Sequence, residues 1–494
     1  MYFLGYDLGS SSVKAALFDI KTHKVIASAS YPPQEMKISS PYPGWAEQDP
    51  EEWWQNVIQV TRLLMSQVPS EKHKVQGIGI SYQMHGLIVL DKNRQILRPA
   101  IIWCDSRATI QGEKLYKSLG ATYCQQRLLN APGNFTAAKL SWIRENEPEI
   151  FGQIDTIMLP GDFLAFKLTG EIFTTISGLS EGTFWDFENH EPAEKLLNCV
   201  QGSGEILPKL TDTFGLQGNL TTKAAHALNL PSDIPLWYRA GDQPNNALAL
   251  GVSAPGEVAA SGGTSGVVYG IADAHINDTK NRINSFAHVN HSKPETRLGV
   301  LLCINACGIL YRWIRQNIGN SATYDQLELL AAQSMVGAQG LSFLPFGNGG
   351  ERMLLFKNES AQLYGLDLNR HERKDLIRAG LEGVAFSFVY GIEMMKTLGV
   401  PIQKINVAND NLFQSDIFSQ TIANLAEATI EMKVTTGAIG AAQAAAFASG
   451  AYASLKEATF DPTISKTFNP AISGHYKQAY EQWKNYLKLS LTNS

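Results

Sequence analysis

A short loop between two strand-like runs occurs twice in this chain, about half its length apart. Residues 3–19 read FLGYDLGSSSVKAALFD, and residues 258–270 read VAASGGTSGVVYG. In each copy, small residues and hydroxyl side chains form a tight turn that presents several main-chain N–H groups at one place, as a phosphate chain requires. One Gly/Ser turn alone is more often an ordinary hairpin. Two copies in corresponding places predict two similar domains that face each other across one nucleotide.

The length and charge of the chain narrow the classes of protein to which it can belong. At 494 residues it is too long for one hydrophobic core, so two or three domains are expected. Its net charge of −5 gives no electrostatic reason to expect nucleic acid or an anionic membrane as a partner. No apolar run approaches the roughly 18 residues that a transmembrane helix needs. We therefore expect a globular protein that binds small molecules.

The cysteines and the first residues of the chain indicate the cellular compartment in which the protein is expected. Five cysteines are too few and too scattered for a disulfide framework, and Cys303 and Cys307 lie in an apolar stretch that predicts a helix. No second cysteine pair or histidine cluster accompanies them, so a zinc site is not expected. The first residues enter a strand at once, without a cleavable or basic segment. We expect buried thiols in the cytoplasm and no targeting signal.

Hydrophobic periodicity predicts α/β structure in both halves. In the first half, we expect strands at 2–7, 13–19, 24–30, 75–83, 86–91 and 234–240, and helices at 49–68 and 136–146. The first helix has Asp49 as its N-cap and Pro50 at its first position. In the second half, we expect helices near 304–317, 325–335, 372–398, 438–449 and 476–489. No low-complexity linker separates the halves, so domains 1–244 and 245–494 are expected to meet at a close hinge.

Asp242 is the strongest candidate for a catalytic group. It lies in RAGDQPNNALALG (239–251), where an expected strand gives way to a Gly-Asp turn, and Gln243 follows it. A carboxylate at the end of a strand is well placed to accept a hydroxyl proton. Alternatively, Asp242 caps the helix that starts at Pro244, since aspartate is a favoured cap. The phosphate-type loop that comes next in the chain favours the catalytic role.

The segment YQMHGL (82–87) places polar residues at the end of another strand, where α/β folds often contact ligands. Met84 can pack on the carbon face of a sugar, and His85 can form a hydrogen bond with a sugar hydroxyl. A lone histidine is more often structural and satisfied by a carbonyl, and that alternative stays open. In WCDSRA (103–108), we expect Asp105 and Arg107 to form a structural ion pair that helps to shape the sugar pocket.

Asp7 places a carboxylate inside the first phosphate-type loop. A negative charge fits a phosphate site only when a cation lies between them, and Mg²⁺ held by carboxylate and phosphate oxygens is the obvious candidate. The hydroxyls of the same loop belong to Ser10, Ser11 and Ser12. Lys14 follows on the next strand, either near the phosphates or as a solvated lysine.

Several segments together resemble the FGGY family of carbohydrate kinases, and within it the members that phosphorylate xylulose. The resemblance covers nearly the whole chain and rests on DLGSSSVK (7–14), QMHG (83–86), ILRPAIIWCDSRA (96–108), KLSWIREN (139–146), AGDQ (240–243), GGTSGVV (262–268), LSFLPFGNGGER (341–352), LYGLDL (363–368) and GLEG (380–383). The family fold consists of two ribonuclease-H-like domains of the actin and hexokinase type, which close over ATP and sugar. The resemblance therefore implies an α/β fold with an interdomain cleft, and family members often form homodimers.

The resemblance also implies roles for individual residues. Asp242 corresponds to the general base that takes the proton from the terminal hydroxyl of the sugar, and Asp7 to the acidic residue near the γ-phosphate and Mg²⁺. The implied sugar contacts are Met84, His85 and Gln243. The implied nucleotide contacts are Gly263, Thr264 and Gly308, in addition to Ser10, Ser11, Ser12 and Lys14. The implied reaction is ATP-dependent phosphorylation of D-xylulose to D-xylulose 5-phosphate.

One segment departs from the family pattern. Where the family has a glycine-rich stretch near the adenosine, this chain reads VANDNLFQS (407–415), with Asp410 and Asn411 in place of glycines. Asn and Asp tolerate left-handed backbone better than other side chains, so the turn can survive, but both side chains would contact or crowd the nucleotide. Two alternatives stay open: a kinase for L-ribulose, gluconate or glycerol, and a catalytically silent sugar or nucleotide sensor. Glycerol kinases carry an Arg-Glu pair where this chain has Met84 and His85.

Overall fold

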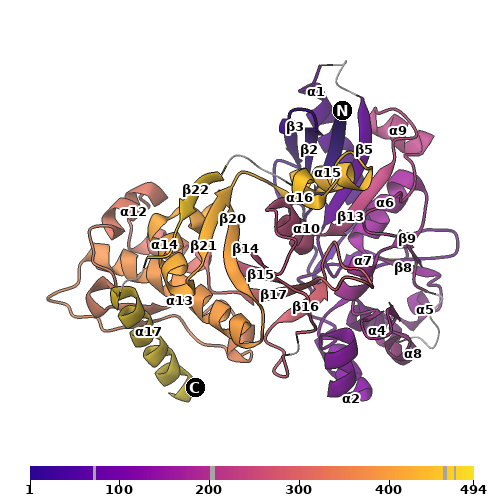
Figure 1. Ribbon diagram of the computed structural model, residues 1–494. Helices are drawn as coiled ribbons and strands as arrows, with labels where there is room; N and C mark the ends of the chain where they lie inside the picture. The colour runs from indigo at the N-terminus through magenta and orange to yellow at the C-terminus, as the bar shows by residue number, and fades with distance from the viewer. Residues whose placement is uncertain (70–73, 201–205, 277, 460–463, 472–473, 494) are drawn as a thin grey trace.

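The computed structural model describes residues 1–69, 74–200, 206–276, 278–459, 464–471 and 474–493, which form two lobes (Figure 1). The sheet of the first lobe has the strand order β13-β5-β1-β2-β3, and that of the second lobe β16-β17-β15-β14-β20-β21-β22. The first sheet comprises β1 (Tyr2–Leu8), β2 (Val13–Asp19), β3 (Lys24–Tyr31), β5 (Val75–Tyr82) and β13 (Leu236–Gly241). The second comprises β14 (Gly256–Gly262), β15 (Gly266–Ala272), β16 (Asn284–Ala287), β17 (Leu298–Ile304), β20 (Ile402–Ala408), β21 (Thr429–Lys433) and β22 (Ile464–Phe468).

Five strands of the second sheet repeat the arrangement of the first. Strands β1, β2 and β3 form an antiparallel meander, as do β14, β15 and β17. On the other side of β1, strands β5 and β13 are parallel to it, just as β20 and β21 are parallel to β14. The two phosphate-type loops are therefore equivalent turns, each closing the first hairpin of its sheet. The predicted α/β fold with two similar domains is confirmed.

Helices cover both faces of the first sheet. Helix α1 (Pro50–Ser66) lies against β2 and β3, and the Asp49 carboxylate accepts a hydrogen bond from Glu51 N–H, so the predicted N-cap is confirmed. The same lobe contains α6 (Pro160–Thr169), α7 (Ile176–Glu181), α9 (Thr222–Leu228) and a group of helices below the sheet, α2 (Thr109–Leu119), α4 (Thr136–Asn146), α5 (Pro148–Phe151) and α8 (Glu194–Val200). Its short strands include β4 (Glu47–Gln48), β6 (Ile88–Leu90), β7 (Ala100–Ile101) and β8 (Thr156–Met158). The predicted strand at 86–91 is thus shorter, and it pairs with β8 outside the main sheet.

The second lobe differs from the prediction at residues 304–307 and at α14 (Asp416–Ala426), a helix that was not predicted. Residues 304–307 do not begin a helix: Cys303 lies in β17, and α11 starts only at Gly308 (Gly308–Asn317). An apolar run of this kind is compatible with a buried strand as well as with a helix. Here its first part, up to Ile304, pairs with β15 and forms the end of strand β17. The other helices of this lobe are α12 (Tyr324–Ala331), α13 (Arg373–Thr397), α14 (Asp416–Ala426) and α17 (Gly474–Asn493).

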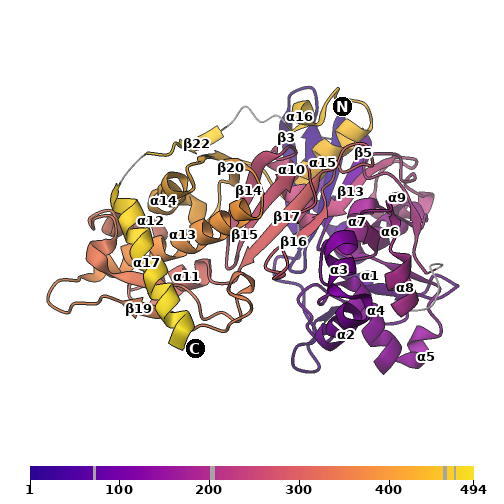
Figure 2. The same cartoon turned by 60° about the horizontal axis from the view of Figure 1, so that its bottom comes forward.

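Two helices join the lobes. Helix α10 (Asp242–Ala249) leads from β13 into the second sheet, and α15 (Gly437–Ala448) packs beside it. Although α15 lies between β21 and β22 of the second lobe in the chain, it packs on the sheet of the first lobe, against β1, β5, β2 and β13 (Figures 1 and 2). Adjacent to it is the short helix α16 (Leu455–Ala458).

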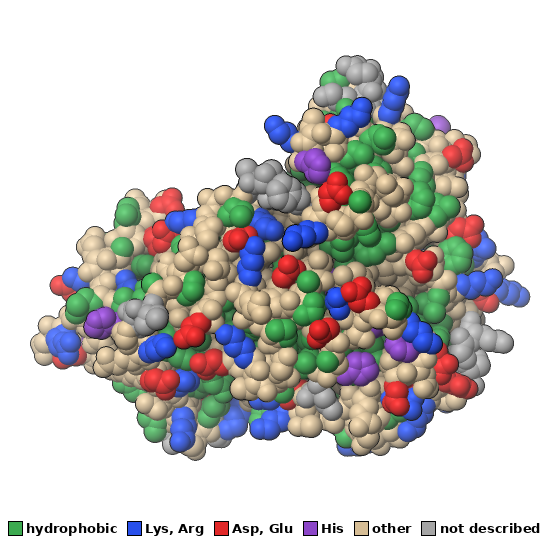
Figure 3. Space-filling model, in the orientation of Figure 1, with side chains coloured by type: hydrophobic (Ala, Val, Ile, Leu, Met, Phe, Trp, Pro, Cys, Tyr) green, Lys and Arg blue, Asp and Glu red, His purple; other side chains and the backbone are tan. Residues whose placement is uncertain are grey.

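None of the described helices is long and apolar enough to cross a bilayer. On the face shown in Figure 3, acidic and basic side chains are interspersed over both lobes, in keeping with a net charge of only −5.

Candidate active site

Asp7 lies at the end of β1, directly before the first phosphate-type loop. Its Oδ1 accepts a hydrogen bond of 2.8 Å from the Ser81 hydroxyl on β5. Burial raises the pKa of Asp7, while the nearby charge of Lys14 and the Ser81 hydrogen bond lower it. Lys14 pairs with Asp7 across the hairpin, and its side chain is exposed. The structure therefore brings the predicted metal-binding carboxylate and the predicted phosphate-loop lysine together.

The loop itself, residues 9–12, is closed by a hydrogen bond of 3.0 Å from Gly9 N to Ser12 O. It is also braced from outside. Buried Gln48 on β4 donates from Nε2 to Ser10 O at 2.7 Å. The exposed Trp103 donates from its indole nitrogen to Ser10 Oγ at 3.4 Å. The backbone position of this loop is thus fixed before any phosphate binds.

Asp242 occupies the first position of α10, with Gly241 as the N-cap residue. Burial, and to a smaller extent the negative charge of Asp7, raise the pKa of Asp242 to about 7. Hydrogen bonds with Gln243 oppose the shift. Asp242 therefore does not cap the helix in the way the structural alternative required. Its carboxylate interacts with Gln243 and with the charge of Asp7 beside the first phosphate-type loop, and the preceding residue, Gly241, closely approaches Met84.

Met84 and His85 follow the end of β5, the strand that pairs with β13, and Gly241 at the end of β13 precedes Asp242 in the chain. A Cβ atom added to Gly241 would be 2.5 Å from Met84 Cγ and 2.4 Å from Glu181 Oε2, so Gly241 allows both to approach this strand end. The His85 ring packs near Phe135 and Phe286, with ring centroids at 4.6 and 5.3 Å. Burial lowers the pKa of His85 to about 3, which makes the ring neutral. His85 Nδ1 also lies 2.8 Å from the main-chain oxygen of Glu181, which is the carbonyl contact that the structural alternative expected.

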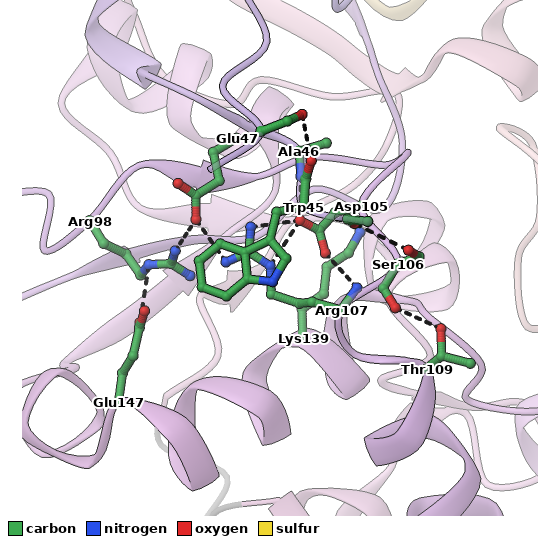
Figure 4. Close-up of polar contacts among 12 residues, drawn as sticks. Trp45, Ala46, Glu47, Arg98, Asp105, Ser106, Arg107, Thr109, Lys139 and Glu147 are labelled. Carbon is green, nitrogen blue, oxygen red and sulfur yellow. Dashed lines mark hydrogen bonds and ion pairs between the residues drawn. The ribbon is translucent and has the colours of Figure 1, made fainter. Parts of the chain in front are cut away.

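Behind the sugar-site residues lies a buried network of charged groups, drawn in Figure 4. Arg107 forms ion pairs with Asp105 at 2.6 Å and with Glu47 at 2.7 Å. Arg98 pairs with the same Glu47 and, at 3.2 Å, with Glu147. The Asp105–Arg107 ion pair is confirmed. Since Glu47 precedes Gln48 on β4, this network also anchors the residue that braces the first phosphate-type loop.

The second phosphate-type loop forms one wall of a cavity of about 370 Å³ in the second lobe. The N-terminus of α11 lies directly on this loop, since Gly308 N donates to Gly263 O at 3.0 Å. A Cβ atom at Gly308 would be 2.4 Å from the same carbonyl oxygen, so only glycine allows this approach. The stacked rings of Tyr311 and Tyr324 contribute to the opposite part of the lining, which comprises Gly262, Gly263, Thr264, Gly308, Tyr311, Arg312, Tyr324, Asp325, Glu328, Asn411, Leu412, Gln414 and Ser415.

The two residues that replace the expected glycines behave differently. Asn411 lines the cavity and has a left-handed backbone with φ of 51°, a conformation that asparagine tolerates. Asp410 has an extended backbone, with φ of −148° and ψ of 169°, which any residue can adopt. It is exposed and is not among the residues that line the cavity. The turn therefore survives, and of the two only Asn411 borders the cavity.

Sequence profiles of two domains match this chain: the N-terminal domain of the FGGY family of carbohydrate kinases at residues 2–249, and the C-terminal domain of the same family at residues 258–449. The chain belongs to the FGGY family of carbohydrate kinases. It is therefore a phosphotransferase that acts on a carbohydrate, and its two lobes have the actin and hexokinase type of fold.

Individual FGGY proteins resemble the chain along its whole length. Xylulose kinase of Staphylococcus epidermidis is 30% identical over 98% of this chain and 96% of its own. Xylulose kinase of Lactococcus lactis is 31% identical over 99% and 96%, respectively. Among solved structures, xylulose kinase from Rhodospirillum rubrum superposes with a TM-score of 0.90 at 26% identity, covering 99% of both chains.

Several residues of the site were not predicted from the sequence. Two of them, Lys139 and Glu181, form hydrogen bonds with His85. Two others, Gly437 and Asn246, lie close to each other, and Gly437 also adjoins Asp7. The four residues come from four different helices. Lys139 belongs to the family motif KLSWIREN, which was the only signal for it. No sequence motif marked Tyr311 or Tyr324 as a cavity residue. Tyr311 lies inside an expected helix, and Tyr324 directly precedes another. Such residues are found only when the fold brings distant segments together.

Proposed function

We propose that this FGGY kinase transfers the γ-phosphoryl group of ATP to the terminal hydroxyl of D-xylulose, forming D-xylulose 5-phosphate. The observation that supports the proposal most strongly is Asp242, a carboxyl group whose pKa burial and the charge of Asp7 raise to about 7, next to Gly241, which closely approaches Met84. The names of the full-length relatives support xylulose as the acceptor. The 370 Å³ cavity beside Thr264 and Gly308 supports a nucleotide site in the second lobe.

In the proposed reaction, Asp242 accepts the proton of the sugar hydroxyl as its oxygen forms a bond to the γ-phosphorus. The bond from that phosphorus to the bridging oxygen breaks, and ADP leaves with the electron pair. Positioning and charge stabilisation contribute most of the rate in such transfers. Gln243, Met84 and His85 would hold the sugar, while Ser10, Ser11, Ser12, Lys14, Gly263 and Thr264 would hold the phosphates.

The surroundings of Asp7 fit a Mg²⁺ ion bound with the nucleotide. Ser81 occupies Oδ1, and Oδ2 faces Gly437 at the start of α15. A Cβ atom at Gly437 would be 2.7 Å from Asp7 Oδ2 and 2.8 Å from Asn246 Oδ1, so glycine leaves room beside two oxygen ligands. Mg²⁺ favours one or two such ligands together with phosphate oxygens and water. When bound, the ion would neutralise phosphate charge beside Asp7.

A substrate panel tests the proposal. Release of ADP from ATP is measured with D-xylulose, L-ribulose, gluconate and glycerol, and D-xylulose is expected to give the highest kcat/KM by at least about tenfold. Asp242→Asn keeps the shape of the side chain and should lower kcat by about 10²–10⁴-fold, the usual contribution of general-base catalysis. A higher kcat/KM with another acceptor would refute the substrate. Nucleotide binding without turnover on any acceptor would instead support a silent sensor.

A further inference from the structure

His85 has a backbone conformation that requires an external constraint. Its φ is 61°, in the left-handed region that is uncommon for residues other than glycine, although histidine adopts it more often than most side chains, as asparagine and aspartate do. Such residues persist only where their surroundings determine them, and they occur most often at functional sites. Three hydrogen bonds from two residues supply the constraint at His85.

Glu181 and Lys139 make these hydrogen bonds. His85 N donates to Glu181 Oε1 at 3.3 Å, and His85 Nδ1 lies 2.8 Å from the main-chain oxygen of Glu181. From the other side, Lys139 Nζ donates to His85 O at 2.7 Å. Glu181 ends α7 and Lys139 lies in the first half of α4, so two helices hold a single residue of the loop that follows β5.

Both residues are completely buried, at 0% exposure. Burial lowers the pKa of Lys139 to about 7, with the charge of Asp105 opposing the shift, and burial raises the pKa of Glu181 well above its usual range. Burying an ionisable side chain is unfavourable unless it is hydrogen-bonded or paired with an opposite charge. The contacts made by both converge on His85.

The contact with Glu181 determines where the histidine proton lies. A carbonyl oxygen can only accept, so the proton of the neutral ring belongs on Nδ1, and Nε2 keeps its lone pair. We propose that Lys139 and Glu181 are positioning residues that fix His85 as a hydrogen-bond acceptor for a hydroxyl group of the sugar. This proposal rests on the proposed sugar-kinase function.

The consequence is selectivity for the acceptor. Nε2 of this tautomer can accept a hydroxyl hydrogen but offers no hydrogen to a carbonyl or carboxylate oxygen. A sugar with hydrogen in place of that hydroxyl would leave Nε2 unpaired in a buried site, which is unfavourable. Among deoxygenated analogues of the acceptor, the one that lacks the hydroxyl facing His85 should have a KM about tenfold or more above the parent sugar.

The first test reads the tautomer directly and needs no turnover. In ¹⁵N-histidine-labelled full-length protein without ligands, the His85 resonances are identified by their absence in His85→Gln. We expect a protonated Nδ1 and a lone pair on Nε2 from pH 6 to 8, and a change in the Nε2 resonance when D-xylulose is added. A proton on Nε2 in the ligand-free protein would overturn the proposal, whatever the substrate is.

The second test separates positioning from folding. Lys139→Met should raise KM for the ketose about tenfold or more while KM for ATP changes less than twofold. Lys195→Met is the matched control, because Lys195 also donates to a main-chain carbonyl of the same lobe, that of Leu119, at 3.0 Å. Glu181→Gln keeps the acceptor oxygen and should stay within about threefold of the parent protein, whereas Glu181→Leu should resemble Lys139→Met.

Equal effects of Lys139→Met on both KM values, or an equal effect of Lys195→Met, would overturn the positioning role. If Lys139→Met does not fold, the Glu181→Gln and Glu181→Leu pair and the tautomer measurement still decide. Turnover of no sugar at all, together with a protonated Nδ1, would refute the proposed function and leave the constraint on His85 intact.

Discussion

At the residue scale, the buried position of Asp242 favours catalysis but disfavours folding of the ionised protein. A general base works best when its pKa lies near the operating pH, which requires the charged form to be disfavoured relative to a free carboxylate. Burial and the neighbouring Asp7 produce that effect and raise the pKa to about 7. The same environment makes the ionised side chain unfavourable for folding.

This linkage predicts a pH-dependent effect of Asp242→Asn on stability. Because the folded pKa is raised above the unfolded value, the folded state binds the proton more tightly, and the free energy of unfolding falls as the pH rises from about 4 to 7. The asparagine variant carries no such charge. We expect its Tm to exceed that of the parent protein by about 2 °C or more at pH 8, and by less at pH 5, in thermal unfolding without ligands.

The catalytic counterpart is an acidic limb in the profile of kcat/KM for the sugar, with activity rising through about pH 7 as Asp242 loses its proton. Asp105→Asn is not a suitable control because Asp105 holds Arg107, so Asp233→Asn, a change at a surface loop residue, serves instead. A Tm difference between the asparagine variant and the parent that is the same at pH 5 and pH 8 would contradict the raised pKa.

The sequence could predict residues of this site only where a motif marked them. Asp7, Met84, His85 and Asp242 all lie at strand ends within recognisable segments. The tolerance of Asn411 for left-handed backbone was also predictable, since its side chain type permits that conformation. Lys139 and Glu181 were not predictable as partners of His85, because they are 54 and 96 positions away in the chain and no pattern in the sequence connects them to it.

At the scale of elements, helix α15 shows why a correct secondary-structure prediction did not give the packing. Its sequence, GAIGAAQAAAFA, is apolar on nearly all sides, so it predicts a buried helix but no particular face or partner. The structure buries it on the first sheet because two strand glycines leave space for its backbone. A Cβ atom at Gly5 would be 1.9 Å from Ala438 O, and one at Gly79 would be 2.0 Å from Ala441 O.

This contact predicts a large effect of a single methyl group. Gly5→Ala must displace the backbone of α15 from β1, and overpacking of this kind costs about 1–3 kcal/mol or more. We expect a Tm decrease of about 4 °C or more in thermal unfolding. The matched control is Gly152→Ala, where the backbone is helical and the nearest atom, Pro148 O, would be at an ordinary 3.5 Å. An unchanged Tm for Gly5→Ala would mean that α15 does not lie this close to the sheet.

At the scale of the whole molecule, the repeated loop predicted the symmetry of the two sheets, but not how the lobes are joined. The connection runs through α10, whose first residue is Asp242. At its other end, Leu250 O accepts hydrogen bonds from Asn406 Nδ2 at 2.9 Å and Lys433 Nζ at 2.7 Å, both from the second sheet. Near its start, Asn245 Nδ2 donates to Gly437 O on α15 at 2.9 Å. The helix that carries the candidate base is thus hydrogen-bonded to the second sheet at one end and to α15 at the other.

This arrangement places the proposed nucleotide site and the proposed sugar site on different lobes. The residues that line the cavity beside Thr264 all lie between positions 262 and 415 in the second lobe, whereas Asp7, Met84 and His85 belong to the first. Phosphoryl transfer requires the donor and acceptor atoms to come within about 3–3.5 Å, and closure also excludes water that would hydrolyse ATP. We therefore expect the two lobes to approach each other about α10 and α15 when both ligands are bound.

Small-angle X-ray scattering measures this closure. We expect the radius of gyration to decrease when D-xylulose and a non-hydrolysable ATP analogue with Mg²⁺ are added together, and to change less with the nucleotide analogue alone. His85→Gln, which removes a sugar contact, should shift the decrease to higher sugar concentration without abolishing it. A radius of gyration that stays constant with both ligands at saturation, while ADP release is observed with ATP, would show that the lobes already lie at their reactive separation. In that case α10 would serve as a fixed mount for Asp242 and not as a hinge.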